Sequence, residues 1–311
     1  MIGLYSVLVM SPGRLIRRSF KQEILNAVLS EKPPATLYHY TDQNGLLGII
    51  RNKKIWASHH QCLNDTREFL HAKSIIRAEI DERYESLSPE NRRSFETMRS
   101  TLDGPGMEEV NLYVASFSED GDSLPQWRAY SGQGSGFALG FRGQQLVLPE
   151  EFTLARCIYE PEEQSGVARA IVAEVEGMLA RMAAAGADDN LSAWALLLLT
   201  VHQFALIFKH EKFRDEREWR IFSQVLMDFA PAFSTEEPEC ALDFRPGKSM
   251  LVPYRRVPLQ DAKGNFPLDE IVVGPNPNRE QSRRSVQSLL NSQPGLADVK
   301  ARSSEVPFRN W

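Results

Sequence analysis

The chain has 311 residues, of which 42% are hydrophobic and 25% charged, and its formal net charge is −5 at pH 7. This composition indicates a soluble globular protein with an apolar core, and it excludes the global positive field of a non-specific nucleic-acid binder. The cysteines Cys62, Cys157 and Cys240 are far apart and form no Cys-x-x-Cys pair, which argues against a disulfide framework and a zinc site. No apolar run reaches the roughly 18 residues needed to span a bilayer. We therefore expect a cytoplasmic protein that makes no membrane contact.

The first half of the chain predicts a helix followed by alternating strands and helices. The helix covers residues 12–29 and ends before Pro33-Pro34, so residues 1–34 form an N-terminal helical extension. The patterns then predict a strand at 37–41, a helix at 42–50 with Asp42 as N-cap, a strand at 54–58, two charged helices between 68 and 102, a strand at 110–118, a short helix containing Trp127 and Tyr130, and a strand at 137–141.

The second half predicts a helical hairpin at about 165–210, followed by a further series of strands. These are expected from residue 218 onward, at 241–244, 250–257, 270–273 and 298–302, with a helix at 279–290. The sequence therefore predicts one α+β domain over residues 35–311, with helical insertions at about 66–103 and 165–210. The core of this domain is expected to be a split, mostly antiparallel β-sheet.

Two glutamates, Glu216 and Glu218, stand one residue apart at the start of an apolar segment that is typical of a strand. Because alternate side chains of a strand share a face, we expect both carboxylates to point the same way and to raise each other's pKa. This arrangement favours a catalytic site. The alternative is a solvated, salt-bridged face, because four cations lie nearby: Lys212, Arg214, Arg217 and Arg220.

Ten short segments, each a weak family signal when taken alone, follow one another along the chain. They are LYHYT at 37–41, GLLGII at 45–50, IWAS at 55–58, LND at 63–65, ASFS at 115–118, QWRAY at 126–130, GFALGF at 136–141, EREWR at 216–220, IVVGP at 271–275 and the terminal segment 304–309. Together they resemble the bacterial domain-of-unknown-function family 2971, over nearly the whole chain. The layout of that family is in turn similar to a divergent mono-ADP-ribosyltransferase fold.

The resemblance implies NAD as a substrate and assigns a role to each candidate residue. His39, with Tyr40 and Thr41 beside it, would bind the NAD ribose. Trp127 or Tyr130 would stack on the nicotinamide ring. The alternatives are a buried histidine that is satisfied by a neighbouring carbonyl, and aromatic rings that simply pack in the core.

The two glutamates carry the implied chemistry. Cleavage of the nicotinamide–ribose bond passes through an oxocarbenium-like centre, which a carboxylate stabilises. Glu218 would supply that carboxylate, and Glu216 would orient or deprotonate the acceptor.

The implied activity is that of an intracellular toxin or phage-defence effector that modifies RNA, DNA or protein and is controlled by an antitoxin or regulator protein. A second interpretation is a non-catalytic recognition or sensor module that binds a partner through the helical hairpin. A third is a metal-dependent nuclease that uses Asp65, Glu68 and the glutamate pair. We expect no metal at His59-His60, because adjacent histidines on a loop point apart.

Overall fold

The computed structural model describes residues 23–62, 67–87, 89–104, 111–130, 136–184, 200–223, 240–247 and 249–307. Most of the helix predicted for residues 12–29 lies outside this part of the chain, and its described end is helix α3, Glu23–Ser30. Asn64, Asp65 and the turn predicted near residue 186 also lie outside the described residues.

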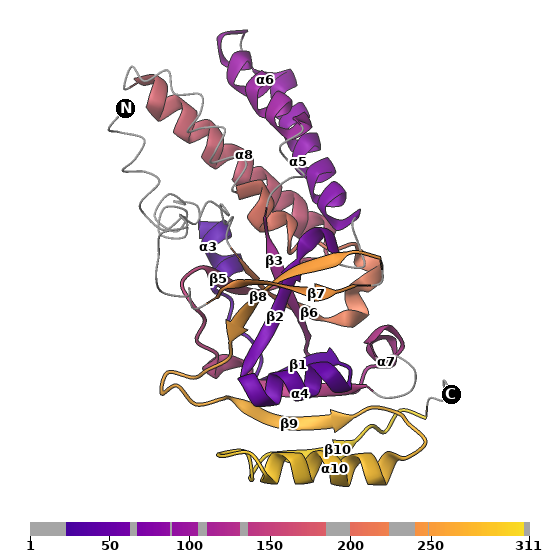
Figure 1. Cartoon of the computed structure of the whole chain (residues 1–311). Coiled ribbons are helices and arrows are strands. Elements are labelled where there is room, and N and C mark those ends of the chain that lie inside the picture. The colour runs from indigo at the N-terminus through magenta and orange to yellow at the C-terminus, as the bar shows by residue number, and fades with distance from the viewer. Residues whose placement is uncertain are drawn as a thin grey trace.

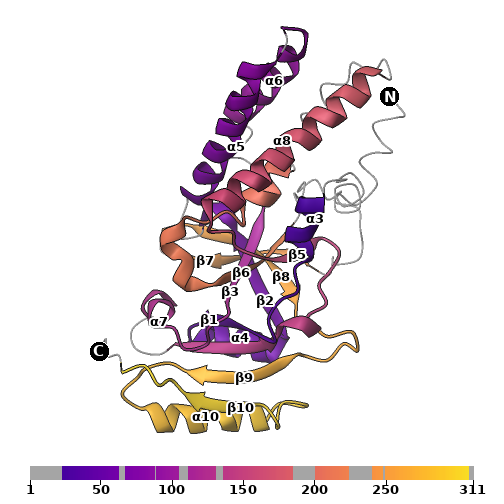
Figure 2. The ribbon, with the colours of Figure 1, turned by 180° about the vertical axis from the view of Figure 1, so that it is seen from behind.

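A mostly antiparallel sheet forms the centre of the described part of the chain (Figures 1 and 2). Its ten strands are β1 Thr36–Thr41, β2 Lys54–His59, β3 Tyr113–Ser118, β4 Phe137–Arg142, β5 Phe152–Arg156, β6 Glu218–Ser223, β7 Leu242–Pro246, β8 Leu251–Pro258, β9 Leu268–Val273 and β10 Lys300–Ser303. The order is β10-β9-β4-β1-β3-β2-β8-β7, with β6 on β3 and β5 on β6. Among these pairs β9 and β10 alone run parallel. The predicted antiparallel character of the sheet is confirmed.

The sheet forks at β3. Along one edge β3 pairs with β6 over its length, from Val114 opposite Phe222 to Ser118 opposite Glu218. Along the other edge it pairs with β2 at its beginning and with β1 at its end, where Tyr38 lies opposite Ser118. Strands β1 and β2 therefore diverge, and the first residue of β6 lies at the β1 end of the fork.

Seven helices are named in the described part of the chain: α3, α4 Gln43–Asn52, α5 Arg67–Ser86, α6 Pro89–Asp103, α7 Leu124–Tyr130, α8 Pro161–Ala184 and α10 Arg279–Asn291. In Figures 1 and 2 the helices α5, α6 and α8 project from one end of the sheet, whereas α10 lies along β9 and β10 at the other. None of the helices in the described residues combines the length and the apolar composition that a membrane span requires.

Local sequence signals explain several of these boundaries. The Asp42 side chain accepts a hydrogen bond from Gly45 N at 2.8 Å, which satisfies one of the free amides at the start of α4. This confirms the predicted N-cap. Pro89 begins α6, as expected for a proline in the first turn of a helix. Of the predicted hairpin at 165–210, the first helix is α8, which begins at Pro161, and residues 200–205 are the described part of the second.

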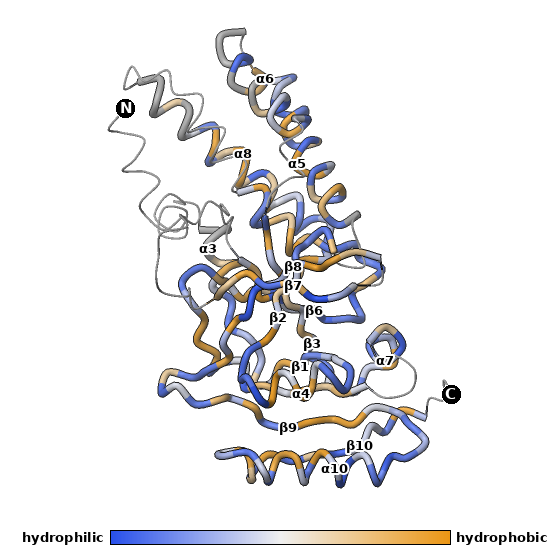
Figure 3. The backbone as a smooth tube through the Cα atoms, viewed as in Figure 1, coloured by the Kyte–Doolittle hydropathy of each residue, from blue (hydrophilic) through white to orange (hydrophobic). Residues whose placement is uncertain are grey.

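Two large apolar clusters pack against the sheet, and a smaller third one contains Tyr40 and Trp127. Figure 3 shows that hydrophobic residues are frequent along the strands, for example along β9. One of the two large clusters contains Trp219 and Ile221 of β6 and the buried side chains of α4 and α10. The other contains Phe222 and the buried side chains of α5, α6 and α8. Because strand side chains alternate between faces, Glu218 and Arg220 lie on the α5 and α8 side with Phe222.

Candidate functional site

The entry to β6 differs from the arrangement that the sequence predicts. Glu216 ends a 3-10 segment, Glu211–Glu216, and the strand begins only at Glu218. Between them Arg217 adopts a left-handed conformation with φ 42°. Simple alternation along one strand therefore does not align the two carboxylates, and that part of the prediction is wrong. They meet instead at a third residue, Lys209.

The Lys209 ammonium lies between the two glutamates. Its Nζ donates to Glu216 Oε2 at 2.5 Å and also to Glu218 Oε2. Arg220, two residues along the strand from Glu218, donates from Nε to Glu218 Oε1 at 2.8 Å and from Nη2 to Oε2 at 3.0 Å. Three charge-assisted hydrogen bonds thus hold the Glu218 carboxylate. Only 5% of the Glu218 side chain is exposed.

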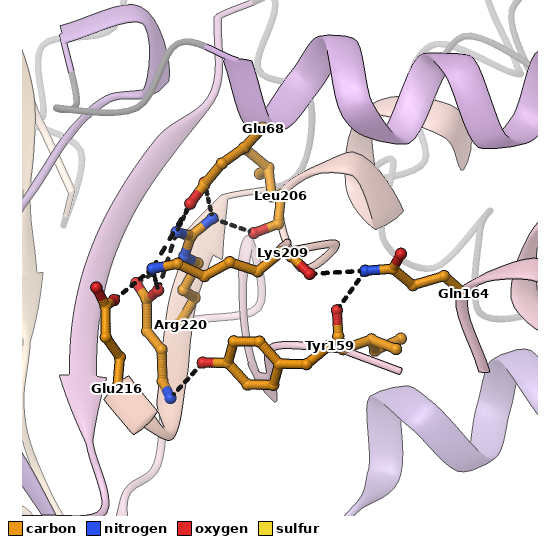
Figure 4. A network of polar contacts seen from close by, with 9 residues as sticks. Glu68, Tyr159, Gln164, Leu206, Lys209, Glu216 and Arg220 are labelled. Atoms are coloured by element: carbon orange, nitrogen blue, oxygen red, sulfur yellow. Dashed lines mark hydrogen bonds and ion pairs between the residues drawn. The ribbon is translucent and has the colours of Figure 1, made fainter. Parts of the chain in front are cut away.

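Glu68 of α5 completes the set (Figure 4). Arg220 donates to both of its oxygens, at 2.6 and 2.9 Å, and also to the Leu206 carbonyl at 2.6 Å. We call the five residues Glu68, Lys209, Glu216, Glu218 and Arg220 the charge cluster. Three carboxylates against two cations leave one negative charge in excess.

Backbone contacts fix the position of the charge cluster. The Tyr159 hydroxyl accepts a hydrogen bond from Glu218 N at 2.9 Å. Gln164 Nε2 donates to the carbonyls of Ile158 and Lys209, at 2.6 and 2.8 Å. The segment that carries Lys209 is thereby tied to the start of α8, as Figure 4 shows.

The pKa of Glu218 moves in the direction opposite to the prediction. Burial raises the pKa of this carboxyl. The attraction of Arg220 and Lys209 outweighs that rise and brings the pKa down to about 2. Burial lowers the pKa of Lys209, and the negative charge of Glu218 reverses this to a net rise. The expectation of a raised pKa is wrong for Glu218, because Arg220 and Lys209 bind its carboxylate. Glu218 is an anion and Lys209 a cation at neutral pH.

Tyr130 lies near the charge cluster and exposes 42% of its surface. Partial removal of the hydroxyl from water raises the pKa of Tyr130, and the negative charges of Glu218 and Glu216 raise it further. Trp127, one helical turn earlier on α7, is buried instead. Its ring lies 4.7 Å from that of Tyr40, and its Nε1 donates to Asp122 at 2.8 Å. Of the two aromatic candidates, Tyr130 therefore presents a ring and Trp127 packs in the core.

His39 is not brought to the charge cluster. Its ring lies 5.7 Å from that of Phe117, which stands opposite Trp219 in the sheet and belongs to the core on the α4 and α10 side. Glu218 stands opposite Ser118, and Ser118 stands opposite Tyr38, so these three side chains share one face of the sheet. His39 follows Tyr38 in β1, and its side chain therefore lies on the opposite face from Glu218. His39 Nδ1 hydrogen-bonds with the Ser116 carbonyl at 2.9 Å, and burial lowers the pKa of its imidazole.

Tyr40 and Thr41 are likewise used by the fold. The Tyr40 hydroxyl donates to the Asp120 carbonyl at 2.7 Å and accepts from Ser123 N at 3.0 Å. Thr41 ends β1 opposite Phe137. The structure thus brings Glu216 and Glu218 together at Lys209, and their charges act on Tyr130. It leaves His39, Tyr40, Thr41 and Trp127 in structural contacts.

Within the described residues, no group of three or more histidine, cysteine, aspartate or glutamate side chains could hold a metal ion. In the charge cluster the carboxylate oxygens bind Lys209 and Arg220. Asp65, one of the residues predicted for a metal-dependent nuclease, lies outside the described residues.

The sequence interpretation missed Lys209 as a member of the site and treated Arg220 as a surface cation. Arg220 carried a signal, because positions 218 and 220 of one strand share a face. Lys209 carried a weaker one, since it follows the apolar run of residues 204–208. Glu68 was predicted only among the residues of the metal-dependent nuclease, and its partner Arg220 lies 152 positions away.

Residues 126–221 match the model of a family described as "Protein of unknown function (DUF2971)". The matched segment contains Tyr130 and every member of the charge cluster except Glu68. No curated protein and no solved structure matches the chain.

Proposed function

We propose that the charge cluster and Tyr130 form the catalytic centre of an NAD-dependent mono-ADP-ribosyltransferase. In this proposal Glu218 and Glu216 are the anionic groups, Tyr130 is the aromatic surface, and a macromolecule of the same cell is the acceptor. The observation that carries the proposal is the excess negative charge beside an exposed aromatic ring.

The charge of the site suits this substrate. The nicotinamide ring of NAD is a cation before the glycosidic bond breaks, and the ribose carbon becomes cationic as it breaks. An exposed tyrosine ring attracts such a cation, and a preformed anion stabilises charge that develops in the transition state. Because the pKa of Glu218 is about 2, this anion needs no proton transfer before it can act.

The fold is compatible with the proposal, and the roles of the residues change. A forked, mostly antiparallel sheet with the catalytic glutamate at the first position of a strand agrees with the ADP-ribosyltransferase type of fold that the family resemblance implies. His39 has no part in the proposal, because its ring lies on the other face of the sheet. The ribose hydroxyls would be bound from the Glu218 face.

The test is the release of nicotinamide from NAD, followed by mass spectrometry with the purified full-length chain and a cell lysate as acceptor. We expect Glu216→Gln and Glu218→Gln each to lower the rate by about a hundredfold, the typical effect of removing one preorganised electrostatic group. Glu280→Gln is the matched control, because Glu280 lies on exposed α10 and binds two arginines there. Full turnover in both cluster variants, or no NAD cleavage by the natural chain, contradicts the proposal.

A second function, partner recognition, is favoured by the projection of α5, α6 and α8 from one end of the sheet (Figure 1). The outer faces of helices that extend beyond the sheet offer a surface to another protein. The same experiment separates the two functions, since a recognition module releases no nicotinamide at any concentration of lysate.

A further inference from the structure

Among the strands that the structure describes, β7 is the last of its branch of the sheet. In the described part of the chain its one strand neighbour is β8, with which it pairs from Leu242 opposite Arg255 to Pro246 opposite Leu251. The edge of such a strand offers unpaired backbone groups, and proteins usually shorten or cover it.

The amides of β7 show which residues point to the open edge. Phe244 N donates to the Oδ1 atom of its own neighbour Asp243 at 2.8 Å, rather than to β8. Its partner across the ladder is Pro253, which has no N–H to give. Phe244 and, by alternation, Leu242 and Pro246 therefore direct their backbone groups away from β8.

Apolar side chains gather at the same place. Leu242 is 37% and Phe244 54% exposed on the strand, and Met250 and Leu251 at the hairpin end are 58% and 66% exposed. By register, Leu242 and Phe244 share one face with Leu251 of β8. Asp243 and Arg245 lie on the other face, where Asp243 accepts from Tyr254 and Arg245 donates to Ser58.

The sequence of β7, Leu-Asp-Phe-Arg-Pro, is complementary to itself when read in the opposite direction. If two copies pair antiparallel about Phe244, Asp243 of each copy stands opposite Arg245 of the other. Leu242 of one copy stands opposite Pro246 of the other. The Leu242 N–H donates to the Pro246 carbonyl, and Pro246 has no N–H to donate in return. The two phenylalanines form the central pair, in which each Phe244 amide exchanges its bond to Asp243 Oδ1 for a bond to the carbonyl of the other Phe244.

We propose that β7 is a homodimer interface, in which two copies of this chain join their sheets edge to edge about a two-fold axis at Phe244. The two Asp243–Arg245 pairs fall at non-hydrogen-bonded positions, where facing side chains are closest, and opposite charges stabilise such positions. A two-fold axis repeats each contact, so the interface is isologous. Because one short strand pair carries it, we expect a dissociation constant on the order of micromolar.

Charge exchange tests the proposal by sedimentation of the full chain over a concentration series. Asp243→Arg alone and Arg245→Asp alone each place like charges opposite one another twice, and we expect each to weaken the dimer at least tenfold. The double exchange restores both pairs and should return the dissociation constant to near its natural value. No other partner strand predicts this rescue.

Two further variants keep the test interpretable if an exchange disturbs folding. Phe244→Ser should abolish the dimer, whereas Trp56→Ser, which removes a 43% exposed aromatic from β2 on the other face, should leave it intact. In the paired arrangement the two Phe244 Cα atoms are about 5.5 Å apart, within disulfide range, so Phe244→Cys should cross-link under mild oxidation and Lys263→Cys should not. A natural chain that remains monomeric at every concentration, or a double exchange that fails to rescue while both single variants weaken the dimer, overturns the proposal.

Discussion

Lys209 joins Glu216 and Glu218, with its Nζ 2.5 Å from Glu216 Oε2 and hydrogen-bonded to Glu218 Oε2. The two carboxylates that stand together in the sequence are thus neighbours in space because a cation from another segment lies between them. Their environments differ, since 26% of the Glu216 side chain is exposed and only 5% of that of Glu218. This difference leads to separable predictions.

The first prediction concerns the stability of the charge cluster. Glu218→Gln removes the buried carboxylate that both Lys209 and Arg220 bind, and we expect the free energy of unfolding to fall by about 3–5 kcal/mol. Glu216→Gln removes a partly exposed charge and should lower it by about 1 kcal/mol. Urea unfolding at neutral pH measures both. Equal effects of the two changes would show that burial does not distinguish them.

The second prediction concerns pH. The pKa of Glu218 is about 2 in the folded chain and 4.5 as an ordinary glutamate. A carboxyl with a lowered pKa stabilises the fold fully above its ordinary pKa and loses this contribution as pH falls from about 4.5 towards 2. Urea unfolding between pH 6 and pH 2 should show this loss in the natural chain and a smaller one in Glu218→Gln. About 0.5 M salt should leave the difference largely intact, because buried pairs are screened less than exposed ones.

The third prediction separates Tyr130 as a binding surface from Tyr130 as a structural residue. Because the ring is partly exposed, Tyr130→Ala should change stability by only about 0.5 kcal/mol. If the ring attracts the cationic nicotinamide, the same change should raise KM for NAD by about tenfold, and Tyr130→Phe should stay near the natural value. Steady-state nicotinamide release gives both constants. An unchanged KM in Tyr130→Ala would remove the ring from the proposed site.

The fourth prediction uses two glycines with opposite surroundings. A Cβ at Gly48 in α4 would meet no atom within 4 Å, so Gly48→Ala should stabilise the chain by about 0.5–1 kcal/mol through helix propensity. A Cβ at Gly121 would lie 2.4 Å from the Tyr38 ring, so Gly121→Ala should destabilise by about 1–3 kcal/mol. Thermal unfolding of the two variants against the natural chain measures the signs.

Local patterns were sufficient for much of the fold. The unit of β1, α4 and β2, its Asp42 cap and the helices α5, α6 and α10 follow from periodicity and capping residues that lie within each segment. Strand β5 was missed, because its five residues carry only a short apolar pattern. The strand is stabilised by its pairing with β6, some 65 positions later.

The candidate site was less predictable, because it depends on neighbours that local sequence does not specify. The face to which His39 points follows from the pairing of β1 with β3, and neither strand alone determines that register. The direction of the Glu218 pKa shift follows from Lys209 and Arg220, and the expectation from two adjacent carboxylates had the wrong sign because it omitted both cations.

The bond between Glu68 and Arg220 spans 152 positions and therefore has a consequence for protein synthesis. A nascent chain that has emerged only as far as α8 contains Glu68 but lacks Arg220, which binds it, and Lys209, whose Nζ lies 3.6 Å from it. It also lacks β6. The carboxylate must remain hydrated until the later segment leaves the ribosome. If the proposed chemistry holds, the chain is inert during translation, and its activity begins only once both halves of the cluster have been made and have folded together.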